Sequence, residues 1–127
     1  MRVLLLGGTG EARALAQTLH RRIDLVSSLA GRVPDPALPV GPVRIGGFGG
    51  VDGLRRWLHD EHIDAVVDAT HPFAATMTAH AAAACTELRI PHLILARPAW
   101  DPGAALVVDS DTDAAETVVR QGYSRVF

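Results

Sequence analysis

The chain contains no lysine, and all 12 of its basic residues are arginines. This absence excludes three kinds of site within the chain: a phosphate loop that relies on lysine, a Schiff-base lysine, and the Tyr-x-x-x-Lys pair of short-chain dehydrogenases. Because nucleotide-sugar epimerases use that same pair, the sequence also disfavours an epimerase.

Cysteine, aromatic residues and net charge are also scarce. Cys85 is the single cysteine, so it cannot form an internal disulfide, and its alanine-rich surroundings favour a small buried side chain over a reactive thiol. Aromatic residues make up 5% of the chain, the formal net charge is −2, and no basic block or basic amphipathic helix occurs. We therefore expect neither nucleic acid nor a membrane as a partner.

Neither a signal peptide nor a metal site is expected. The first apolar run is too short for a signal peptide and leads directly into glycines, which favours a cytoplasmic protein. His59 and His62 lie three residues apart, but the charged run around them is typical of a solvated helix end, so no metal site is expected.

What is present is one domain's worth of chain, 127 residues of which 48% are hydrophobic. Apolar runs of strand length alternate with longer segments of helical period, which predicts an α/β, Rossmann-like fold: a doubly wound, mainly parallel sheet with helices on both faces. The patterns place strands at 2–6, 23–29, 43–45, 65–69, 92–96 and 106–108, and helices at 11–20, 52–62, 74–88 and 112–121. A further strand begins at 125, which suggests a domain of a longer protein.

A glycine turn joins the first strand to the first helix. Gly7, Gly8, Thr9 and Gly10 form this turn, and Glu11 follows them in the helix. Bare backbone and the free N–H groups of a helix N-terminus suit a pyrophosphate, and the Thr9 hydroxyl could reach a phosphate oxygen. The alternative is that these glycines only make a tight turn.

The end of the second strand bears on which dinucleotide binds. NAD-binding folds usually place an acidic residue there, whereas NADP-binding folds remove the acid and supply arginine. This strand ends in Ser27 and Ser28, Arg32 follows closely, and Asp24 lies at the opposite end. A guanidinium suits a 2′-phosphate, so the sequence favours NADP(H) over NAD(H). A solvated loop arginine is the plainer alternative.

A second glycine-rich run, "IGGFGG", follows the third strand. Loops that leave the carboxyl edge of a parallel sheet face the ligand crevice. We therefore expect Gly47, Phe48 and Gly49 to form a wall that contacts the cofactor, with the Phe48 ring as a flat surface. The alternative is a flexible turn before the next helix.

The segment Thr70-His71-Pro72-Phe73 follows the strand at 65–69, which we expect to lie centrally in the sheet. It should reach the same edge, near a nicotinamide. Pro72 is compatible with the first turn of the next helix, and Thr70 or His71 could cap that helix or touch the cofactor. His71 is a candidate proton donor, although capping explains it equally well.

Five blocks of the sequence together resemble the precorrin-6A reductase family of cobalamin biosynthesis. They are "LLLGGTGEARALA", "SSLAGR", "VRIGGFGGVDGL", "DAVVDATHPFA" and "ARPAW". The resemblance implies an oxidoreductase that uses NADPH to reduce one double bond of a precorrin-type tetrapyrrole. Residue by residue, it implies that Gly7 to Gly10 contact the diphosphate, Ser28 and Arg32 the 2′-phosphate, and Gly47 to Gly49 and Thr70 to Phe73 the cofactor wall.

The resemblance also has consequences for the organisation of the protein. Members of the family continue into a second α/β domain that closes the substrate cleft. Residues 1–127 would then be the NADP(H)-binding domain, the N-terminal half of a two-domain enzyme, inactive without its C-terminal partner domain. Arg97 and Trp100 are candidate contacts to the carboxylates of the substrate, and the catalytic acid stays unassigned. A non-catalytic, NADP(H)-binding regulatory module is the alternative function.

Overall fold

The computed structural model describes residues 1–96, 103 and 109–122. The chain divides into two compact units, Met1–Ala96 and Arg97–Phe127. In the described part of the second unit lies helix α4 (Asp111–Arg120), whose N-terminus is capped because the Ser110 hydroxyl accepts a hydrogen bond from the backbone N–H of Asp113 at 3.1 Å. All other described elements belong to the first unit.

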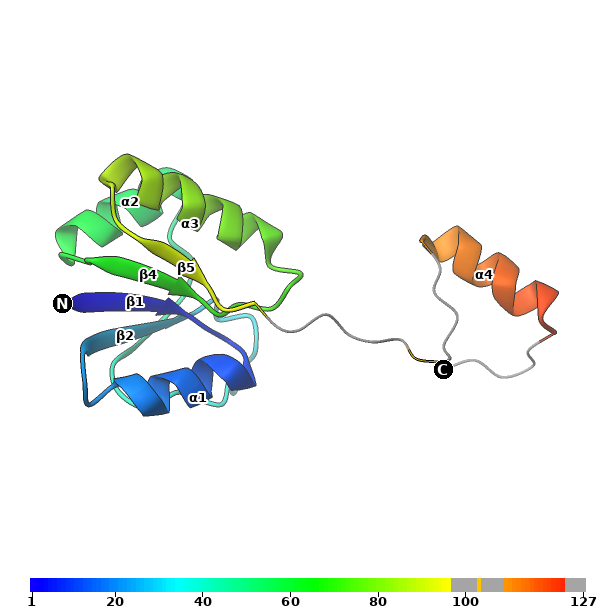
Figure 1. The fold of residues 1–127 in the computed structure, drawn as a ribbon, viewed down its shortest axis with the longest axis horizontal. Helices are drawn as coiled ribbons and strands as arrows, with labels where there is room; N and C mark the ends of the chain where they lie inside the picture. The colour runs from blue at the N-terminus through cyan, green and yellow to red at the C-terminus, as the bar shows by residue number, and fades with distance from the viewer. Residues whose placement is uncertain (97–102, 104–108, 123–127) are drawn as a thin grey trace. The chain divides into compact units, whose positions relative to one another are not determined.

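The first unit contains one parallel sheet (Figure 1). Its strands stand in the order β3-β2-β1-β4-β5, and each neighbouring pair is parallel. From β1 the chain proceeds outward on one side through β2 and β3, then crosses to β4 and β5 on the other side. The predicted doubly wound α/β fold is therefore confirmed. The strands are β1 (Arg2–Leu6), β2 (Asp24–Leu29), β3 (Val43–Ile45), β4 (Ala65–Asp68) and β5 (His92–Ile94).

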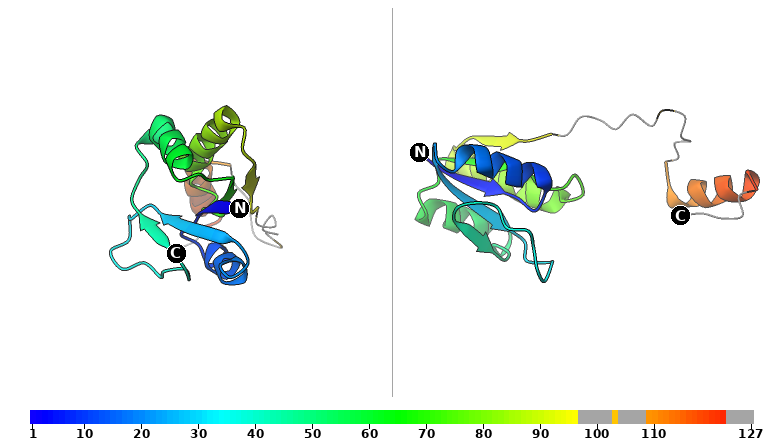
Figure 2. Two further views of the ribbon diagram at one scale, coloured as in Figure 1. Left: turned by 90° about the vertical axis from the view of Figure 1, so that its left-hand side faces the viewer. Right: turned by 90° about the horizontal axis from the view of Figure 1, so that it is seen from below.

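Helices cover both faces of this sheet (Figures 1 and 2). Helix α1 (Gly10–Leu19) lies on one face, and α2 (Gly50–Asp60) and α3 (Ala75–Leu88) lie together on the other. Successive side chains of β1 alternate between the two faces, so this middle strand contributes to both cores. Val3 and Leu5 pack with Ala12, Ala16, Leu25, Ala65 and Ala69, whereas Leu4 and Leu6 pack with Leu54, Leu58, Ile63, Val66, Ala81, Ala84 and Cys85.

Cys85 confirms the prediction of a buried structural thiol. Its side chain lies in the core beneath α2 and α3 and is 1% exposed. Burial disfavours the charged thiolate and raises the pKa of Cys85 to about 11.

The observed boundaries differ from the predicted ones at several ends. Helix α2 begins at Gly50 rather than 52, because Gly49 and Gly50 adopt the left-handed backbone that starts it. Strand β4 lies inside the sheet between β1 and β5, but β1 is the middle strand of the five described. The strands predicted at 106–108 and from 125 lie outside the described residues.

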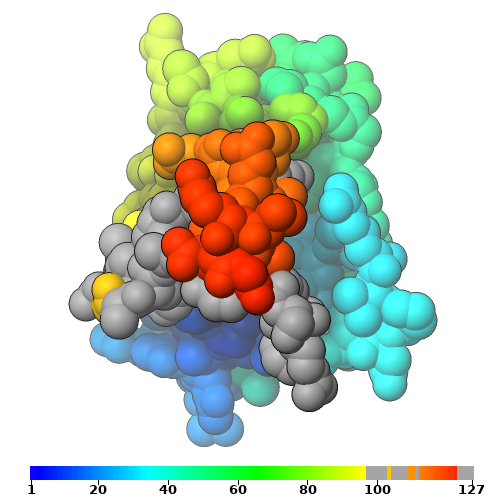
Figure 3. Space-filling model, turned by 90° about the vertical axis from the view of Figure 1, so that its right-hand side faces the viewer, coloured from blue at the N-terminus to red at the C-terminus, as the bar shows by residue number. Residues whose placement is uncertain are grey.

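The proline-rich segment 30–42 forms the predicted loop. It connects β2 to β3 along the surface of the first unit, with most of its residues exposed, and appears in cyan in Figure 3. Among the described residues, no helix is both long enough and apolar enough to cross a membrane.

Candidate functional site

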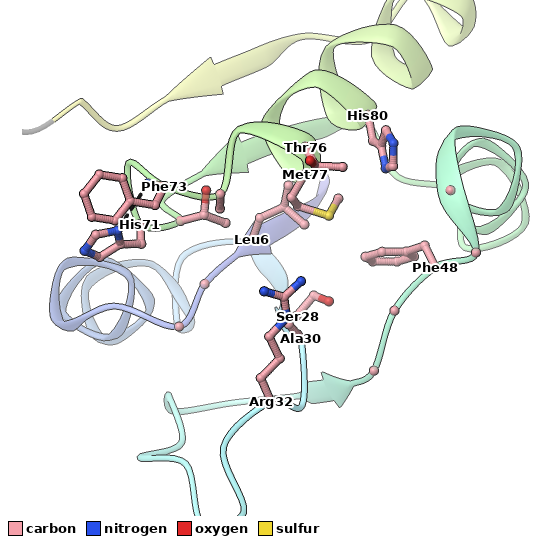
Figure 4. A pocket seen from close by; sticks show the side chains of 18 residues that line it. Leu6, Ser28, Ala30, Arg32, Phe48, His71, Phe73, Thr76, Met77 and His80 are labelled. Atoms are coloured by element: carbon pink, nitrogen blue, oxygen red, sulfur yellow. Dashed lines mark hydrogen bonds between the residues drawn. The ribbon is translucent and has the colours of Figure 1, made fainter. Parts of the chain in front are cut away.

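A cavity of about 600 Å³ opens at the carboxyl edge of the sheet (Figure 4). Segments that follow four strands contribute to its lining: Gly7 and Gly8 after β1, Arg32 after β2, the glycine run after β3, and Thr70 and His71 after β4. Strands β2 and β4 flank β1, where the direction of the chain across the sheet reverses. Open α/β folds bind ligands at such a switch point, and the volume lies within the usual range of small-molecule sites.

The turn after β1 offers bare backbone to the cavity. Gly8 has a φ of 105°, which favours glycine, and a Cβ built there would meet no atom within 4 Å. The Gly7 N–H donates to the Ser28 carbonyl at 2.9 Å and holds the turn against the end of β2. A phosphate could therefore approach the backbone at Gly8 without meeting a side chain, whereas Gly7 packs against Ala12 and Leu29.

Thr9, whose hydroxyl we expected to reach a phosphate oxygen, caps helix α1. Its Oγ1 accepts from the backbone N–H of Ala12 at 3.1 Å and donates to the Ala69 carbonyl at 2.7 Å. Thr9 is the N-cap of α1, and the second bond joins that cap to the end of β4. With Oγ1 occupied in both directions, Thr9 fixes the turn and does not line the cavity.

The end of β2 places two predicted residues at the cavity. Ser28 and Arg32 both line it, and Figure 4 shows the Arg32 side chain extending into it from the loop after β2. Ser27 does not line it: its side chain is 1% exposed, and its Oγ has no hydrogen-bond partner among the described residues.

The glycine run after β3 is held by Arg44. The Arg44 guanidinium donates to the Gly46 carbonyl at 2.9 Å, to the Gly47 carbonyl at 3.0 Å and to Ser28 Oγ at 3.1 Å. It also lies over the Phe48 ring, 3.8 Å from the ring centroid. Desolvation by burial lowers the pKa of Arg44 from its ordinary value, yet a guanidinium stays charged at neutral pH. The hydrogen bonds and the ring contact of Arg44 therefore hold the glycine run in one conformation at the cavity.

Phe48 lines the cavity, and Figure 4 shows its ring at the side opposite His71. A second aromatic ring supports it from behind: Trp57 of α2 meets Phe48 edge to face, with centroids 5.4 Å apart. This pairing fixes the orientation of the Phe48 ring.

The segment after β4 is organised by Asp68. Its buried carboxylate accepts from the Thr70 backbone N–H at 3.0 Å, from Thr70 Oγ1 at 2.6 Å and from Thr78 Oγ1 of α3 at 2.6 Å. Thr70 is therefore bound to Asp68 and does not cap α3. The expected capping role of Thr70 or His71 is wrong, since the N-cap of α3 is Ala74, without a side-chain hydrogen bond.

His71 lies at the rim of the cavity next to Phe73. The Phe73 backbone N–H donates to His71 Nδ1 at 3.2 Å, and the two ring centroids are 4.8 Å apart. Because Nδ1 accepts in this arrangement, the ring proton of a neutral His71 lies on Nε2. Pro72 does not line the cavity and precedes α3 by three residues, so its expected place in the first helical turn is also wrong.

The cavity brings together ten of the fifteen predicted cofactor contacts. These are Gly7, Gly8, Ser28, Arg32, Gly47, Phe48, Gly49, Thr70, His71 and Phe73; those that do not line it are Thr9, Gly10, Glu11, Ser27 and Pro72. The candidate substrate residues Arg97 and Trp100 lie outside the described residues. Over the residues that the structure does describe, no three His, Cys, Asp or Glu side chains gather in a way that could hold a metal ion.

Sequence reasoning missed one face of α3. Thr76, Met77 and His80 line the cavity from this helix (Figure 4). The spacing of Met77 and His80 puts them on one side of a helix, a signal that was present in the sequence.

A family model described as Precorrin-6x reductase CbiJ/CobK matches residues 2–127. The chain belongs to this family. It is 71% identical over 126 residues to the precorrin-6A reductase of Mycobacterium tuberculosis (strain CDC 1551 / Oshkosh), an alignment that covers 99% of this chain and 52% of the relative. To the precorrin-6A reductase of Rhodococcus erythropolis it is 52% identical, over 95% of this chain and 55% of the relative.

A solved structure described as CobK precorrin-6A reductase is similar in fold as well as in sequence. It superposes with a TM-score of 0.79 at 47% identity, over 82% of this chain and 42% of the other. The chain therefore spans about half the length of the relatives that it matches.

Proposed function

We propose that this chain supplies the NADP(H)-binding domain of a precorrin-6A reductase. The observation that carries the proposal is the cavity at the switch point, where a bare glycine turn, Arg32 with Ser28, and the Phe48 wall face one space. The relatives' names specify the reaction class, and they favour a reductase over a regulatory module.

The residues present fit a dinucleotide phosphate. A Cβ at Gly8, Gly46 or Gly47 would meet no atom within 4 Å, so these positions leave open space where a diphosphate needs it. Among the described residues that line the cavity none is acidic, whereas Arg32 is one of them. An arginine without a competing carboxylate is the expected arrangement for a ribose 2′-phosphate.

When bound, NADPH would supply the hydride that reduces a double bond of the precorrin ring. The protein's own part is to bind and orient. Gly7 and Gly8 would face the diphosphate, Arg32 and Ser28 the 2′-phosphate, and Phe48 would close one side. His71, with its proton on Nε2, would act there as a hydrogen-bond donor.

Few residues of this chain are candidates for contacts with the substrate. Arg97 and Trp100 stay candidate contacts for the carboxylates of a precorrin, and the cytoplasmic location stays a prediction. Because the chain spans about half of its relatives, we expect residues 1–127 alone to bind NADPH but not to reduce precorrin-6A at a useful rate. Robust turnover by these residues alone would contradict that expectation.

The test of the proposed cofactor compares two coenzymes. Isothermal titration of the 127-residue chain should give a lower Kd for NADPH than for NADH, and Arg32→Ala should abolish the difference by raising the Kd for NADPH alone. Arg56→Ala is the matched control, since Arg56 is an exposed arginine of α2 that does not line the cavity. Equal affinities of the unaltered chain for the two coenzymes would refute the assignment of NADP(H).

A further inference from the structure

Arg44 connects two parts of the cavity wall without lining the cavity itself. It lies on β3, next to β2, and the register of the two strands pairs Arg44 directly with Ser28. From there its guanidinium reaches Ser28 Oγ on one side and the carbonyls of Gly46 and Gly47 on the other. One side chain therefore fixes the hydroxyl that ends β2 and the backbone of the glycine run.

The direction of the bond to Ser28 has a chemical consequence. A guanidinium has donors and no acceptor, so Ser28 Oγ must be the acceptor in this contact. The hydroxyl hydrogen of Ser28 then points away from Arg44 and is available to donate. Because Ser28 lines the cavity, a suitable recipient is an acceptor group of the ligand near Arg32.

The hydrogen bonds from Arg44 to the carbonyls of the glycine run also favour an anionic ligand. Backbone carbonyls carry partial negative charge, which would repel an anionic group at the cavity wall. Arg44 compensates this charge at Gly46 and Gly47, and the ring of Phe48 beneath it keeps the guanidinium in place. The cavity wall next to Ser28 therefore repels a phosphate less strongly.

We propose that Arg44 is a positioning residue that sets the preference for NADP(H) by orienting the Ser28 hydroxyl as a donor to the 2′-phosphate and by holding the glycine run in place. This inference rests on the proposed function and deepens it. Arg32 contacts the ligand in this arrangement, whereas Arg44 acts through Ser28 and the backbone.

The experiment measures coenzyme preference in single and double variants of the 127-residue chain. Titrations with NADPH, NADH, adenosine 2′,5′-bisphosphate and AMP are carried out on Ser28→Ala, Arg44→Gln, Arg44→Lys and Ser28→Ala/Arg44→Gln, with Arg56→Gln as the control. Ser28→Ala should raise the Kd of the two ligands that carry a 2′-phosphate roughly tenfold and leave the other two unchanged.

Arg44→Gln should produce the same selective loss or a larger one, and the double variant should lose no more than Arg44→Gln alone. Arg44→Lys keeps the charge but cannot reach all three acceptors, so it should restore only part of the preference. Comparable melting temperatures of the variants show that each is folded.

The outcomes separate the inference from the function on which it rests. An equal loss of NADPH and NADH affinity in Arg44→Gln would mean that Arg44 only supports the fold, and additive losses in the double variant would mean that it does not act through Ser28. Either result overturns the inference while leaving NADP(H) binding intact. Failure of the unaltered chain to bind NADPH would instead overturn the proposed function.

Discussion

Among single residues, Asp68 organises the segment that follows β4. It is 2% exposed at the end of β4, and its carboxylate accepts hydrogen bonds from Thr70 and Thr78. Buried carboxylates are costly unless such donors surround them. The carboxylate therefore joins the segment after β4 to α3 and fixes the position of Thr70.

Replacement of Asp68 by asparagine should destabilise the fold. Asparagine keeps one acceptor oxygen, but its NH₂ group faces the hydroxyl of either Thr78 or Thr70. The charge-assisted hydrogen bonds are then lost, which should lower the free energy of unfolding by about 2 kcal/mol. Urea denaturation measures the change. Asp60→Asn, at an exposed carboxylate of α2, should alter stability little, and equal effects of the two variants would contradict the account.

Cys85 provides a prediction about pH. Since burial raises its pKa to about 11, only about one thiol in a thousand is ionised at pH 8. The folded protein should react slowly with a disulfide reagent at this pH, and the rate should rise steeply once urea unfolds the chain. A native rate equal to that of the unfolded chain would show that the thiol is not buried.

Among the elements, the glycine run and α2 depend on one close contact. A Cβ built at Gly53 of α2 would overlap the carbonyl oxygen of Phe48. Only glycine lets the helix approach the loop this closely, and the approach brings Trp57 against Phe48. The wall of the cavity and its supporting helix therefore form one unit.

Gly53→Ala should lower both stability and coenzyme affinity. Alanine is the better helix former by about 1 kcal/mol, but the overlap must displace the loop, and we expect a net loss of about 1–3 kcal/mol. Gly47→Ala is the matched control: its Cβ would meet no atom within 4 Å, so stability should hold while binding weakens at the cavity. Thermal melting and NADPH titration of both variants provide the measurement, and a stable, tightly binding Gly53→Ala would refute the contact.

The elements differ in how far the sequence could predict them. The apolar run of β1 and the helical periods of α1 and α2 reflect burial against the sheet, which periodicity reports directly, and α3 was recognised from its alanine-rich sequence. The cap at Thr9 was also within reach of capping rules, because Thr9 immediately precedes α1. The role of Arg44 could not be predicted, because its partners depend on the pairing of β3 with β2, which local sequence patterns do not specify. Pro72 was misplaced because residues 71–74 form a turn before α3, in which the Ala74 N–H donates to the His71 carbonyl at 2.8 Å.

At the scale of the first unit, the cavity is a consequence of topology. With β1 buried on both faces and β2 and β4 on opposite sides of it, the loops after all of these strands converge at one edge. Helix α1 packs on one face of the sheet, and α2 and α3 pack on the other (Figure 1). The proposed dinucleotide site lies at this edge, in a chain that belongs to the Precorrin-6x reductase CbiJ/CobK family.

The central claim is that NADPH occupies this cavity. The most direct measurement is a titration of the ¹⁵N-labelled chain with NADPH, followed by two-dimensional NMR of the backbone amides. The amide signals of Gly7, Gly8, Arg32 and Gly46–Gly50 should show the largest chemical-shift changes. The amide signals of the remote turn at 61–64 should not change. Saturable shifts that avoid the glycine turn and the glycine run, or no shifts at millimolar NADPH, would contradict the central claim.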